Sequence, residues 1–581
     1  MRARILALFS IAALTMAGAG AEALATTDHD SDAGGRFDRP QHGFAPANTV
    51  LRPASPEDAG LDPAPIRAAE QRLTEWTLPD PASGHPLFAG AVGLQVHDGK
   101  VVEQFSTGSA VRYSDGAGTE LPPAEQVPMR EDTIFDLASI SKLFTSIAVM
   151  QLVERAEVDV DAPVARYLPE FGVNGKAGIT VEQLLTHTSG LEPFLPLWRD
   201  WPDKAARIAA VMDVAPVAEP GSTYRYSDLN LITLGVLVER LTGDTLDTVV
   251  AERITEPLGM TDTGYNPPPA KLDRIAATEF QGNPDRGMVR GQVHDENAWS
   301  LGGVAGHAGV FSTADDLAVL GQTILNGGSY SGQRILRPHT VRSMLTDYNG
   351  EFPGDAHGLG FELDQIWYMG ALTSPRTAGH TGYTGTSLVI DPGSRSVAVL
   401  LTNRVHPSRN WGSVNPARQA WATALARAMR VRPARGEQAW FSAIGDAGSA
   451  TLSTGTLASR SPVRISFNAF VDSETTDPLT LEISANDGAW ESVPLRATGP
   501  GAPNGEVDRL SGTGHRQWWT VRAQLPQMEQ FSLRWHYRTD TRYTGRGVYV
   551  DAVSVADRHG TLVDGERDPS SLVAHGWSLT S

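Results

Sequence analysis

Cysteine is absent from all 581 residues of this chain. Its absence excludes disulfide bonds, thiolate metal sites, a cysteine nucleophile and a lipid-modified N-terminal cysteine. Positive charge is also scarce, since 48 lysines and arginines stand against 67 acidic residues and leave a net charge of -19. This balance disfavours nucleic acid as a partner. With 41% hydrophobic and 20% charged residues, the chain is typical of a globular protein with room for two or three domains.

Long hydrophobic runs are missing as well, except near the N-terminus. Arg2 and Arg4 precede an apolar run, Ile5–Met16, and Ala23-Leu24-Ala25 offers the small residues that a signal peptidase needs. These features predict a signal peptide over residues 1–25. An uncleaved membrane anchor is the alternative, but the run is shorter than the roughly 20 apolar residues of a bilayer span. We therefore expect a secreted protein, extracellular or cell-wall associated, with no stable membrane insertion after cleavage.

The rest of the chain predicts a leader and two domains. Residues 26–48 have few apolar groups and are expected to form a flexible leader. Residues 49–432 alternate between strand-like and helix-like segments, including a hairpin around Asp98-Gly99, and this pattern predicts one α+β domain. Residues 440–581 contain short alternating runs separated by turn residues, which predict an all-β sandwich. We find no internal repeat and no nucleotide-binding glycine loop.

The most informative motif is Ser139-Ile140-Ser141-Lys142, which places an alcohol and an amine three residues apart. On a helix these positions share a face, so the Lys142 amine can reach the Ser139 hydroxyl. The mostly apolar segment Leu143–Val153 follows, and it predicts a buried helix instead of a solvated surface lysine. Burial is expected to lower the pKa of Lys142, which would make its amine a base for a serine nucleophile.

A second motif, Tyr224–Asn230, predicts a turn that leads into a helix. A tyrosine on a loop beside Ser139 could serve as a phenolate base or as a relay for protons, and Tyr226 is the candidate. A structural role is compatible with the same residues, since Tyr226 can pack while Ser227 or Asp228 caps the helix.

A third motif, Gly379–Thr386, lies directly before a predicted strand. Its glycines let a substrate backbone lie along the strand edge, and Thr381 can hold a carboxylate or a carbonyl. The Tyr383 amide can join the Ser139 amide in an oxyanion hole. The alternative is a glycine-rich turn with an incidental histidine, His380.

These residues together carry a resemblance to a known family. Ser139-x-x-Lys142, Tyr226-Ser227-Asp228 and His380-Thr381-Gly382 resemble the S-x-x-K, Y-x-N and K/H-T-G motifs of the serine β-lactamase and penicillin-binding protein superfamily. The match is closest to the branch of class C β-lactamases, D-Ala-D-Ala carboxypeptidases and related esterases. The resemblance implies an antiparallel sheet flanked by helices plus an all-helical part. Further similar stretches occur in the same order within residues 50–430: Leu184–Leu191, Glu256–Met260 and Gly302–Thr313.

The resemblance also implies a role for each motif. Ser139 would be acylated, while Lys142 and Tyr226 would move protons. Two positions depart from the family pattern: Asp228 stands where Asn is frequent, and His380 stands where class C β-lactamases have Lys. The loss of that fixed positive charge disfavours efficient β-lactam hydrolysis. The implied substrate-binding residues are Asp228, His380, Thr381, Gly382 and Tyr383.

The expected function is that of a secreted serine hydrolase acting through an acyl-enzyme on Ser139. A D-alanyl-D-alanine carboxypeptidase-like activity on peptidoglycan peptides is the first choice, and a carboxylesterase acting on small acyl esters or a β-lactamase is the alternative. A catalytically silent cell-wall-binding protein is the alternative from another class. We expect no cofactor. We also expect no catalytic metal, because His187 and His307 have no ligand partner at helical or hairpin spacing.

The C-terminal sandwich is rich in aromatic residues, which predicts core packing for most of them and allows a glycan-stacking surface. Its segment Tyr543–Val553 resembles the terminal strand of jelly-roll accessory domains on secreted hydrolases and proteases. Residues 440–581 could thus contact the cell wall or a glycan, or only stabilise the protein. Some such sandwiches bind calcium, for which Asp472, Glu474 and Asp551 are candidate ligands, although solvated loop carboxylates are the default interpretation.

Overall fold

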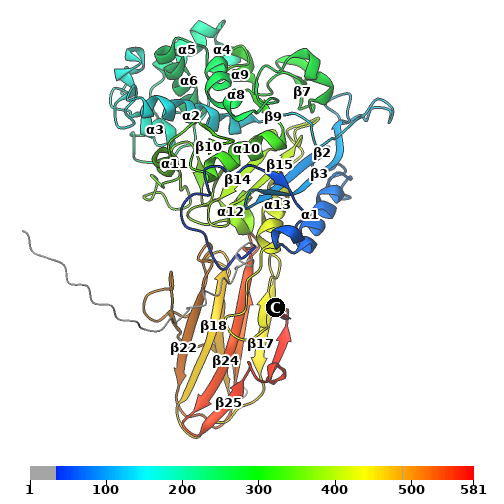
Figure 1. The fold of residues 1–581 in the computed structure, drawn as a ribbon, viewed down its shortest axis with the longest axis vertical. Coiled ribbons are helices and arrows are strands. Elements are labelled where there is room, and N and C mark those ends of the chain that lie inside the picture. Colours follow the sequence, from blue (N-terminus) through cyan, green and yellow to red (C-terminus); the bar gives the residue numbers. More distant parts are fainter. Residues whose placement is uncertain (1–34, 487) are drawn as a thin grey trace, which may run out of the picture.

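A computed structural model describes residues 35–486 and 488–581, and it places an α+β part above an elongated all-β part (Figure 1). The predicted signal peptide, residues 1–25, and residues 26–34 of the predicted leader lie outside the described residues. Among the helices that the structure describes, none combines the length and apolar character needed to cross a membrane.

The described end of the leader, residues 35–48, packs against the α+β part. The Phe37 side chain is buried, and its amide donates to the Arg430 carbonyl at 2.8 Å. The Ala45 amide donates to the Leu325 carbonyl, also at 2.8 Å. The expected flexible leader is therefore wrong for residues 35–48, because one aromatic side chain in a polar stretch reaches an apolar surface formed by distant residues.

The α+β part is built on an eight-stranded sheet. Its strands run in the order β1-β3-β2-β15-β14-β13-β12, with β4 paired to β3. The predicted hairpin joins β2 to β3, and its turn residues Asp98 and Gly99 adopt the positive φ values of 45° and 75° that a tight hairpin turn needs. The strands are β1 (Arg52–Pro53), β2 (Gly90–His97), β3 (Lys100–Val111), β4 (Val127–Pro128), β12 (Glu362–Leu363), β13 (Ala378–Thr381), β14 (Ser387–Asp391) and β15 (Ser396–Thr402).

Helices cover both faces of this sheet. Helix α10 (Ala314–Leu325) packs on β2, β14 and β15, whereas α1 (Pro63–Glu75) and α13 (Asn415–Ala428) pack together on the opposite face (Figure 1). Alternate residues of one strand therefore enter different cores, since Leu388 packs with the α10 side and Val389 with the α13 side. The prediction of an α+β domain is confirmed.

The helical region beside the sheet contains the segment that begins at Ser139. Helix α2 (Ser141–Glu154) is buried from Ser141 to Leu152, as its apolar sequence predicts, and it packs against α6 (Asp228–Thr242). The end of α6 follows its sequence, because Gly243 caps the helix in a left-handed conformation with φ 78°. Other helices of this region are α3 (Val181–Leu185), α4 (Leu197–Asp200), α5 (Lys204–Asp213), α7 (Leu246–Val250), α8 (Glu256–Leu258), α9 (Glu296–Ser300) and α11 (Pro338–Met344).

The all-β part consists of two antiparallel sheets that enclose one core, so the predicted sandwich is confirmed. Strand order is β21-β22-β18-β24-β16-β27 in one sheet, with β25 beside β24, and β20-β19-β23-β17-β26 in the other. The buried Trp519, Trp535 and Tyr537 show that much of the aromatic content fills this core. The longer strands are β17 (Ser449–Thr454), β18 (Val463–Asp472), β19 (Leu479–Ala485), β22 (Trp518–Leu525), β23 (Phe531–Arg538), β24 (Gly547–Asp557) and β25 (Gly560–Asp564); the shorter ones are β16 (Ala439–Ser442), β20 (Trp490–Ser492), β21 (Arg496–Thr498), β26 (Leu572–His575) and β27 (Ser578–Thr580).

The sandwich contacts the α+β part through buried polar and apolar groups. Arg516 Nη1 lies 2.6 Å from the Asp391 carboxylate, and both side chains are at most 2% exposed. Arg546 donates to the Met429 carbonyl at 2.8 Å, just beyond α13. Asp391 ends β14, whereas Ser387 begins it opposite Thr381. The sandwich therefore meets the end of β14 away from Thr381.

Candidate active site

The nucleophile candidate lies at the start of α2. Ser139 belongs to a 3-10 turn, Ala138–Ile140, and Lys142 Nζ lies 2.8 Å from its Oγ. Ala138 has a φ of 46°, an unfavourable value for a residue with a Cβ, and its amide donates to Asp136 Oδ1 at 2.8 Å. The structure thus brings Ser139 and Lys142 together on a strained turn that the buried Asp136 carboxylate supports.

The Lys142 ammonium is buried and fully hydrogen-bonded. Besides Ser139 Oγ, it contacts Asp228 Oδ1 at 2.8 Å and the His307 carbonyl at 3.2 Å. Burial alone would lower the pKa of Lys142, but the Asp228 carboxylate and the Tyr226 hydroxyl outweigh it and raise the pKa above the usual value. The expectation of a lowered pKa is therefore wrong, because the sequence does not show that Asp228 lies beside the amine.

Tyr226 lies next to the Ser139-Lys142 pair. Lys142 Nζ lies 4.8 Å from the ring centroid of Tyr226, and the hydroxyl interacts with both Lys142 and Ser139. Burial raises the pKa of Tyr226 to about 12, against the opposing effect of the ammonium. His187 packs on the ring at 4.5 Å and accepts from the Ser227 amide at 3.1 Å, so His187 positions the tyrosine.

The predicted substrate edge is the end of β13. Strand β12 pairs only with Ala378 and Gly379, which leaves the outer edge of His380 and Thr381 without a β12 partner. His380 is buried, and burial with the nearby Lys142 lowers its pKa to about 3. The imidazole is therefore uncharged, in agreement with the expected loss of fixed positive charge at this position.

The turn after β13 is tied to the segment that carries Ser139. Thr384 Oγ1 donates to the Asp136 carbonyl at 2.7 Å, and Thr386 Oγ1 donates to the Leu137 carbonyl at 3.1 Å. Position 382 requires glycine, because the Cβ of any other residue would lie 2.2 Å from the Leu137 oxygen. These contacts place the loop that carries Tyr383 beside Ser139, the arrangement that an oxyanion hole made from both amides requires.

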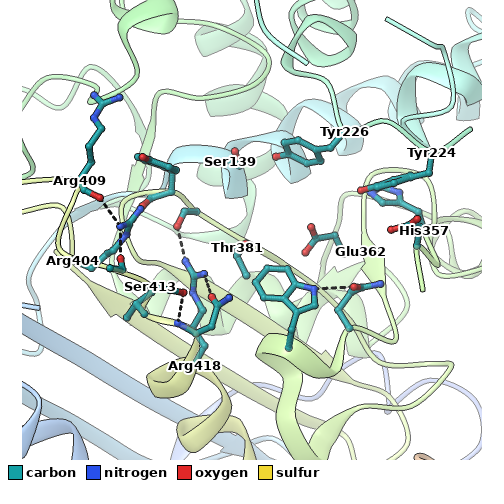
Figure 2. A pocket seen from close by; sticks show the side chains of 18 of the residues that line it. Ser139, Tyr224, Tyr226, His357, Glu362, Thr381, Arg404, Arg409, Ser413 and Arg418 are labelled. Carbon is teal, nitrogen blue, oxygen red and sulfur yellow. Dashed lines mark hydrogen bonds between the residues drawn. The ribbon is translucent and has the colours of Figure 1, made fainter. Parts of the chain in front are cut away.

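A pocket of about 720 Å³ opens at this site (Figure 2). Ser139, Tyr226 and Thr381 lie between two ends of different character, one with arginines and amides and the other with aromatic and acidic groups. Arg418 Nη2 donates to the Gly382 carbonyl at 2.6 Å and so supports the turn after β13. Burial lowers the pKa of Arg418 to about 9. The first end is lined by Arg404, Arg409, Asn410, Ser413, Asn415 and Arg418, and the second by Tyr224, Asp355, His357, Glu362, Gln365 and Trp367.

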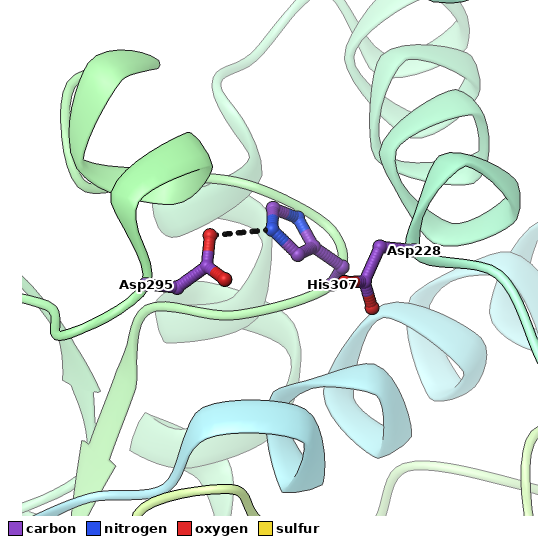
Figure 3. Close-up of side chains that lie close together, drawn as sticks. All are labelled: Asp228, Asp295 and His307. Carbon is purple, nitrogen blue, oxygen red and sulfur yellow. Dashed lines mark hydrogen bonds and ion pairs between the residues drawn. The ribbon is translucent and has the colours of Figure 1, made fainter. Parts of the chain in front are cut away.

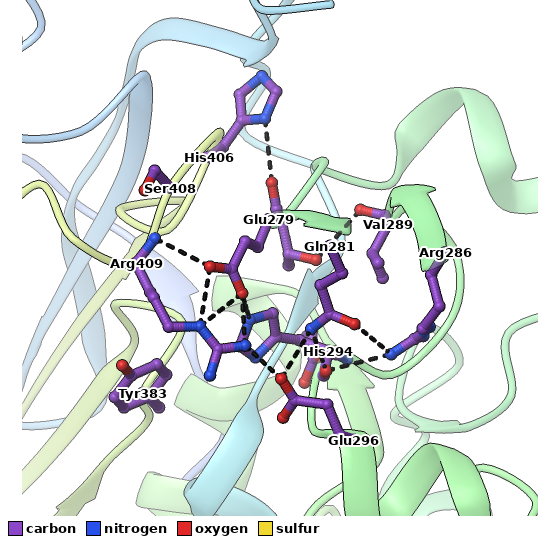
Figure 4. A network of polar contacts seen from close by, with 12 residues as sticks. Glu279, Gln281, Arg286, Val289, His294, Glu296, Tyr383, His406, Ser408 and Arg409 are labelled. Carbon is purple, nitrogen blue, oxygen red and sulfur yellow. Dashed lines mark hydrogen bonds and ion pairs between the residues drawn. The ribbon is translucent and has the colours of Figure 1, made fainter. Parts of the chain in front are cut away.

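Arg409 belongs to a polar network that supports the arginine end (Figure 4). Its guanidinium pairs with the carboxylates of Glu279 and Glu296. His294 Nε2 also contacts Glu279 at 2.9 Å, and the ring of His294 stacks on Tyr383 with centroids 5.9 Å apart. The network thereby links the arginine end of the pocket to the loop that follows β13.

One group of side chains near Lys142 has the spacing of a cation site: Asp228, Asp295 and His307 (Figure 3). His307 Nε2 lies 2.9 Å from Asp295 Oδ1, and Asp228 is paired with the Lys142 ammonium. A metal ion here would lie beside that ammonium, so charge repulsion opposes it. The group is explained without a metal, as a carboxylate-rich surrounding for Lys142.

The candidate calcium ligands of the sandwich are not brought together. Asp472 accepts from the Gly514 and Arg546 amides, and Asp551 accepts from the Arg435 amide. Glu474 lies with a different pair of carboxylates, Asp477 and Asp540. Backbone amides therefore satisfy two of the three candidates.

The motif residues converge, but sequence reasoning missed several groups that line the pocket or approach the lysine. No motif marks His357 and Glu362, which lie in one stretch that ends in β12, or Arg418, which lies in α13. Asp295 was also missed, and its contact with His307 gives that histidine a carboxylate partner. A titratable residue inside an otherwise apolar or helical stretch, such as Glu362 in Leu359–Leu363, is the only signal that the sequence offers.

The fold and the site together define the class of this protein. It is a serine hydrolase with a β-lactamase-like or penicillin-binding-protein-like fold, because helices cover both faces of the sheet and Tyr226 lies beside the buried Ser139-Lys142 pair. Comparison with known proteins agrees, since a family model described as Beta-lactamase matches residues 83–422. The chain therefore belongs to the beta-lactamase family, and the predicted family and enzyme class are confirmed.

The chain is also similar to individual proteins. A protein of Escherichia coli (strain K12) named "Putative D-alanyl-D-alanine carboxypeptidase" is 34% identical over 391 residues, covering 61% of this chain and 86% of that protein. A protein of Salmonella agona (strain SL483) with the same name is 33% identical over 413 residues, covering 64% and 90%. The solved structure of a penicillin-binding protein homologue from Caulobacter crescentus is 23% identical, with a TM-score of 0.49, covering 62% of this chain and 97% of that one.

Proposed function

We propose that this serine hydrolase is a secreted D-alanyl-D-alanine carboxypeptidase-like enzyme that acts on peptidoglycan peptides through an acyl-enzyme on Ser139. The observation that carries the proposal is the 2.8 Å contact between Lys142 Nζ and Ser139 Oγ in a pocket that also contains the free edge of Thr381. The names of the Escherichia coli and Salmonella relatives support the choice of substrate. Secretion rests on the signal peptide predicted for residues 1–25.

Acylation begins when Ser139 Oγ attacks the carbonyl carbon of the scissile amide. The Ser139 proton passes to Lys142 once that residue is an amine, and Tyr226 relays it to the leaving D-alanine nitrogen. Because Asp228 favours the ammonium, the fraction of reactive enzyme should rise with pH. The amides of Ser139 and Tyr383 stabilise the oxyanion, and water later attacks the ester to release the shortened peptide.

The arginine end of the pocket suits the terminal carboxylate of such a peptide. Arg404 and Arg418 line it, and Arg418 is held against the turn by the Gly382 and Thr386 carbonyls at 2.6 and 3.0 Å. A carboxylate placed there would lie next to Thr381, so the scissile carbonyl would face Ser139. This orientation distinguishes a carboxypeptidase from an enzyme that cleaves within a chain.

A carboxylesterase is the second candidate, and the uncharged His380 favours it. A neutral imidazole at the substrate edge leaves that position without the fixed cation that would attract a carboxylate. A β-lactamase is the third candidate and is disfavoured by the same residue. For all three candidate activities, we separately propose that residues 440–581 contact the cell wall or a glycan.

The test uses a labelled penicillin and two substrate classes. We expect a covalent adduct on Ser139, identified by mass spectrometry of the peptide, and no adduct in Ser139→Ala. Release of D-alanine from a D-Ala-D-Ala peptide, measured beside hydrolysis of a nitrophenyl ester, separates the peptidase from the esterase. Absence of both the adduct and any turnover would contradict the proposed acyl-enzyme.

A further inference from the structure

The pocket contains a carboxyl group that the proposed reaction does not use, Glu362. It begins β12 and is paired with Gly379 of β13. Directly opposed residues of an antiparallel pair share a face, and so do residues two apart on one strand. Glu362 and Thr381 therefore project from the same side of the sheet, and both line the pocket that contains Ser139.

The Glu362 carboxyl group is incompletely satisfied. Among the described residues its Oε2 atom is buried and has no hydrogen-bond partner. Burial raises the pKa of Glu362 to about 7, and the opposing effects of Tyr368, Arg418 and Lys142 do not cancel this. The Tyr368 hydroxyl interacts with the carboxyl group, so the group is only partly satisfied. An unsatisfied buried carboxylate oxygen is unfavourable, so a cation that enters the pocket would gain a charge-assisted hydrogen bond there.

The surroundings of Glu362 suit a cation and not an anion. Tyr224 presents its aromatic ring at this end of the pocket (Figure 2). Trp367 and Asp355, which flank Glu362 in the sequence, also line the pocket and add a second aromatic ring and a second carboxyl group. Burial lowers the pKa of His357 to about 4, so this neighbour is uncharged near neutral pH. The three arginines lie at the other end, beyond Ser139 and Thr381, as Figure 2 shows.

We propose that Glu362, with Tyr224 and Trp367, forms a subsite for a positively charged group, such as an alkylammonium, on the acyl part of the substrate. This inference rests on the proposed function, because it takes Ser139 as the point of attack and the arginine end as the side of the leaving group. A substrate with an ammonium on one side of the scissile bond and a carboxylate on the other would match both ends of the pocket.

Two esters of the same shape test the subsite. The cationic ester is 4-nitrophenyl 6-(dimethylammonio)hexanoate, whose N–H can donate to the carboxylate, and the neutral one is 4-nitrophenyl 7-methyloctanoate, in which carbon replaces the nitrogen. We expect kcat/KM to be about tenfold higher for the cationic ester in the wild-type protein. In Glu362→Gln this ratio should fall to about one, because the amide keeps the shape and removes the charge.

The matched control is Glu351→Gln, which removes a carboxylate from an exposed position in the same segment. It should keep the wild-type ratio, and a similar fall there would point to general electrostatic attraction and overturn the proposal. Equal kcat/KM for the two esters in the wild-type protein would also overturn it, whether or not Glu362→Gln folds. A wild-type ratio retained in folded Glu362→Gln would overturn it as well.

A binding measurement separates this proposal from the proposed function. Calorimetry with Ser139→Ala and the two corresponding amides needs no turnover. Tighter binding of the cationic amide that is lost in Ser139→Ala/Glu362→Gln supports the subsite even if no ester is cleaved. Ester hydrolysis without any preference for the cation would leave the serine hydrolase intact and remove only the subsite.

Discussion

The Lys142 ammonium lies 2.8 Å from the Asp228 carboxylate, and its side chain is only 1% exposed. This contact decides the resting state of the site, since it keeps a proton on the amine that must accept one from Ser139. The residue that departs from the frequent Asn of the Y-x-N motif therefore favours the protonated form of the lysine. Turnover should require a higher pH than a site with a neutral amide at this position.

Asp228→Asn tests this relationship. Removing the carboxylate should lower the pKa of Lys142, so the acidic limb of the kcat/KM profile should move to lower pH by about one to three units. The measurement is the pH profile of ester hydrolysis, with Asp285→Asn, an exposed carboxylate elsewhere, as the control. An unchanged acidic limb would show that Lys142 does not govern the rate as a base.

Gly382→Ala should separate the oxyanion turn from the nucleophile. The new Cβ would lie 2.1 Å from Thr386 Oγ1 and 2.2 Å from the Leu137 oxygen, so the turn must move away from Ser139. We expect kcat to fall at least about 100-fold. Gly178→Ala, where an added Cβ meets nothing within 4 Å, is the control and should retain activity. Full activity in a folded Gly382→Ala protein would argue against the Tyr383 amide as an oxyanion donor.

Arg516→Met should weaken the contact between the two parts of the chain. It leaves the fully buried Asp391 carboxylate without its cation, which should reduce the free energy of unfolding by about 3 kcal/mol. Urea unfolding measures this, and adding Asp391→Asn should recover part of the loss. The exposed pair Arg72–Glu75 gives the control, since Arg72→Met should cost less than about 1 kcal/mol. Equal losses in both variants would contradict a stabilising role for the buried pair.

His97 should make the protein sensitive to acid. Burial lowers the pKa of His97 to about 4, whereas an unfolded chain binds the proton near pH 6.5. Its contribution to stability is therefore present above pH 6.5 and is lost as the pH falls toward 4, at about 1.4 kcal/mol per pH unit. Stability measured from pH 7 to 4 should fall less steeply in His97→Gln than in the wild type.

The exposed His559→Gln serves as the control for this experiment. It should have the same pH dependence as the wild-type protein. If the free energy of unfolding fell with the same slope in His97→Gln and in the wild type, the pKa of His97 would be the same in the folded and the unfolded chain, and the prediction would be wrong.

The sequence predicts much of the local structure. The apolar sequence after Lys142 predicts the buried helix α2, and Gly243 marks the end of α6, because both depend on neighbours within a few positions. The strand runs of residues 440–581 are equally local. The packing of Phe37 could not be predicted, since it depends on contacts with residues as distant in sequence as Phe470.

For the site, the sequence by itself determined which reactive groups are present and that Ser139 and Lys142 share one turn, because a spacing of three residues is enough to bring them together. Only the tertiary structure decided their electrostatic state. Asp228 reaches Lys142 across 86 positions, and Glu362 and Arg418 reach the same pocket from β12 and α13. Charge interactions depend on distance and burial in the folded chain, and no local pattern of residues encodes either.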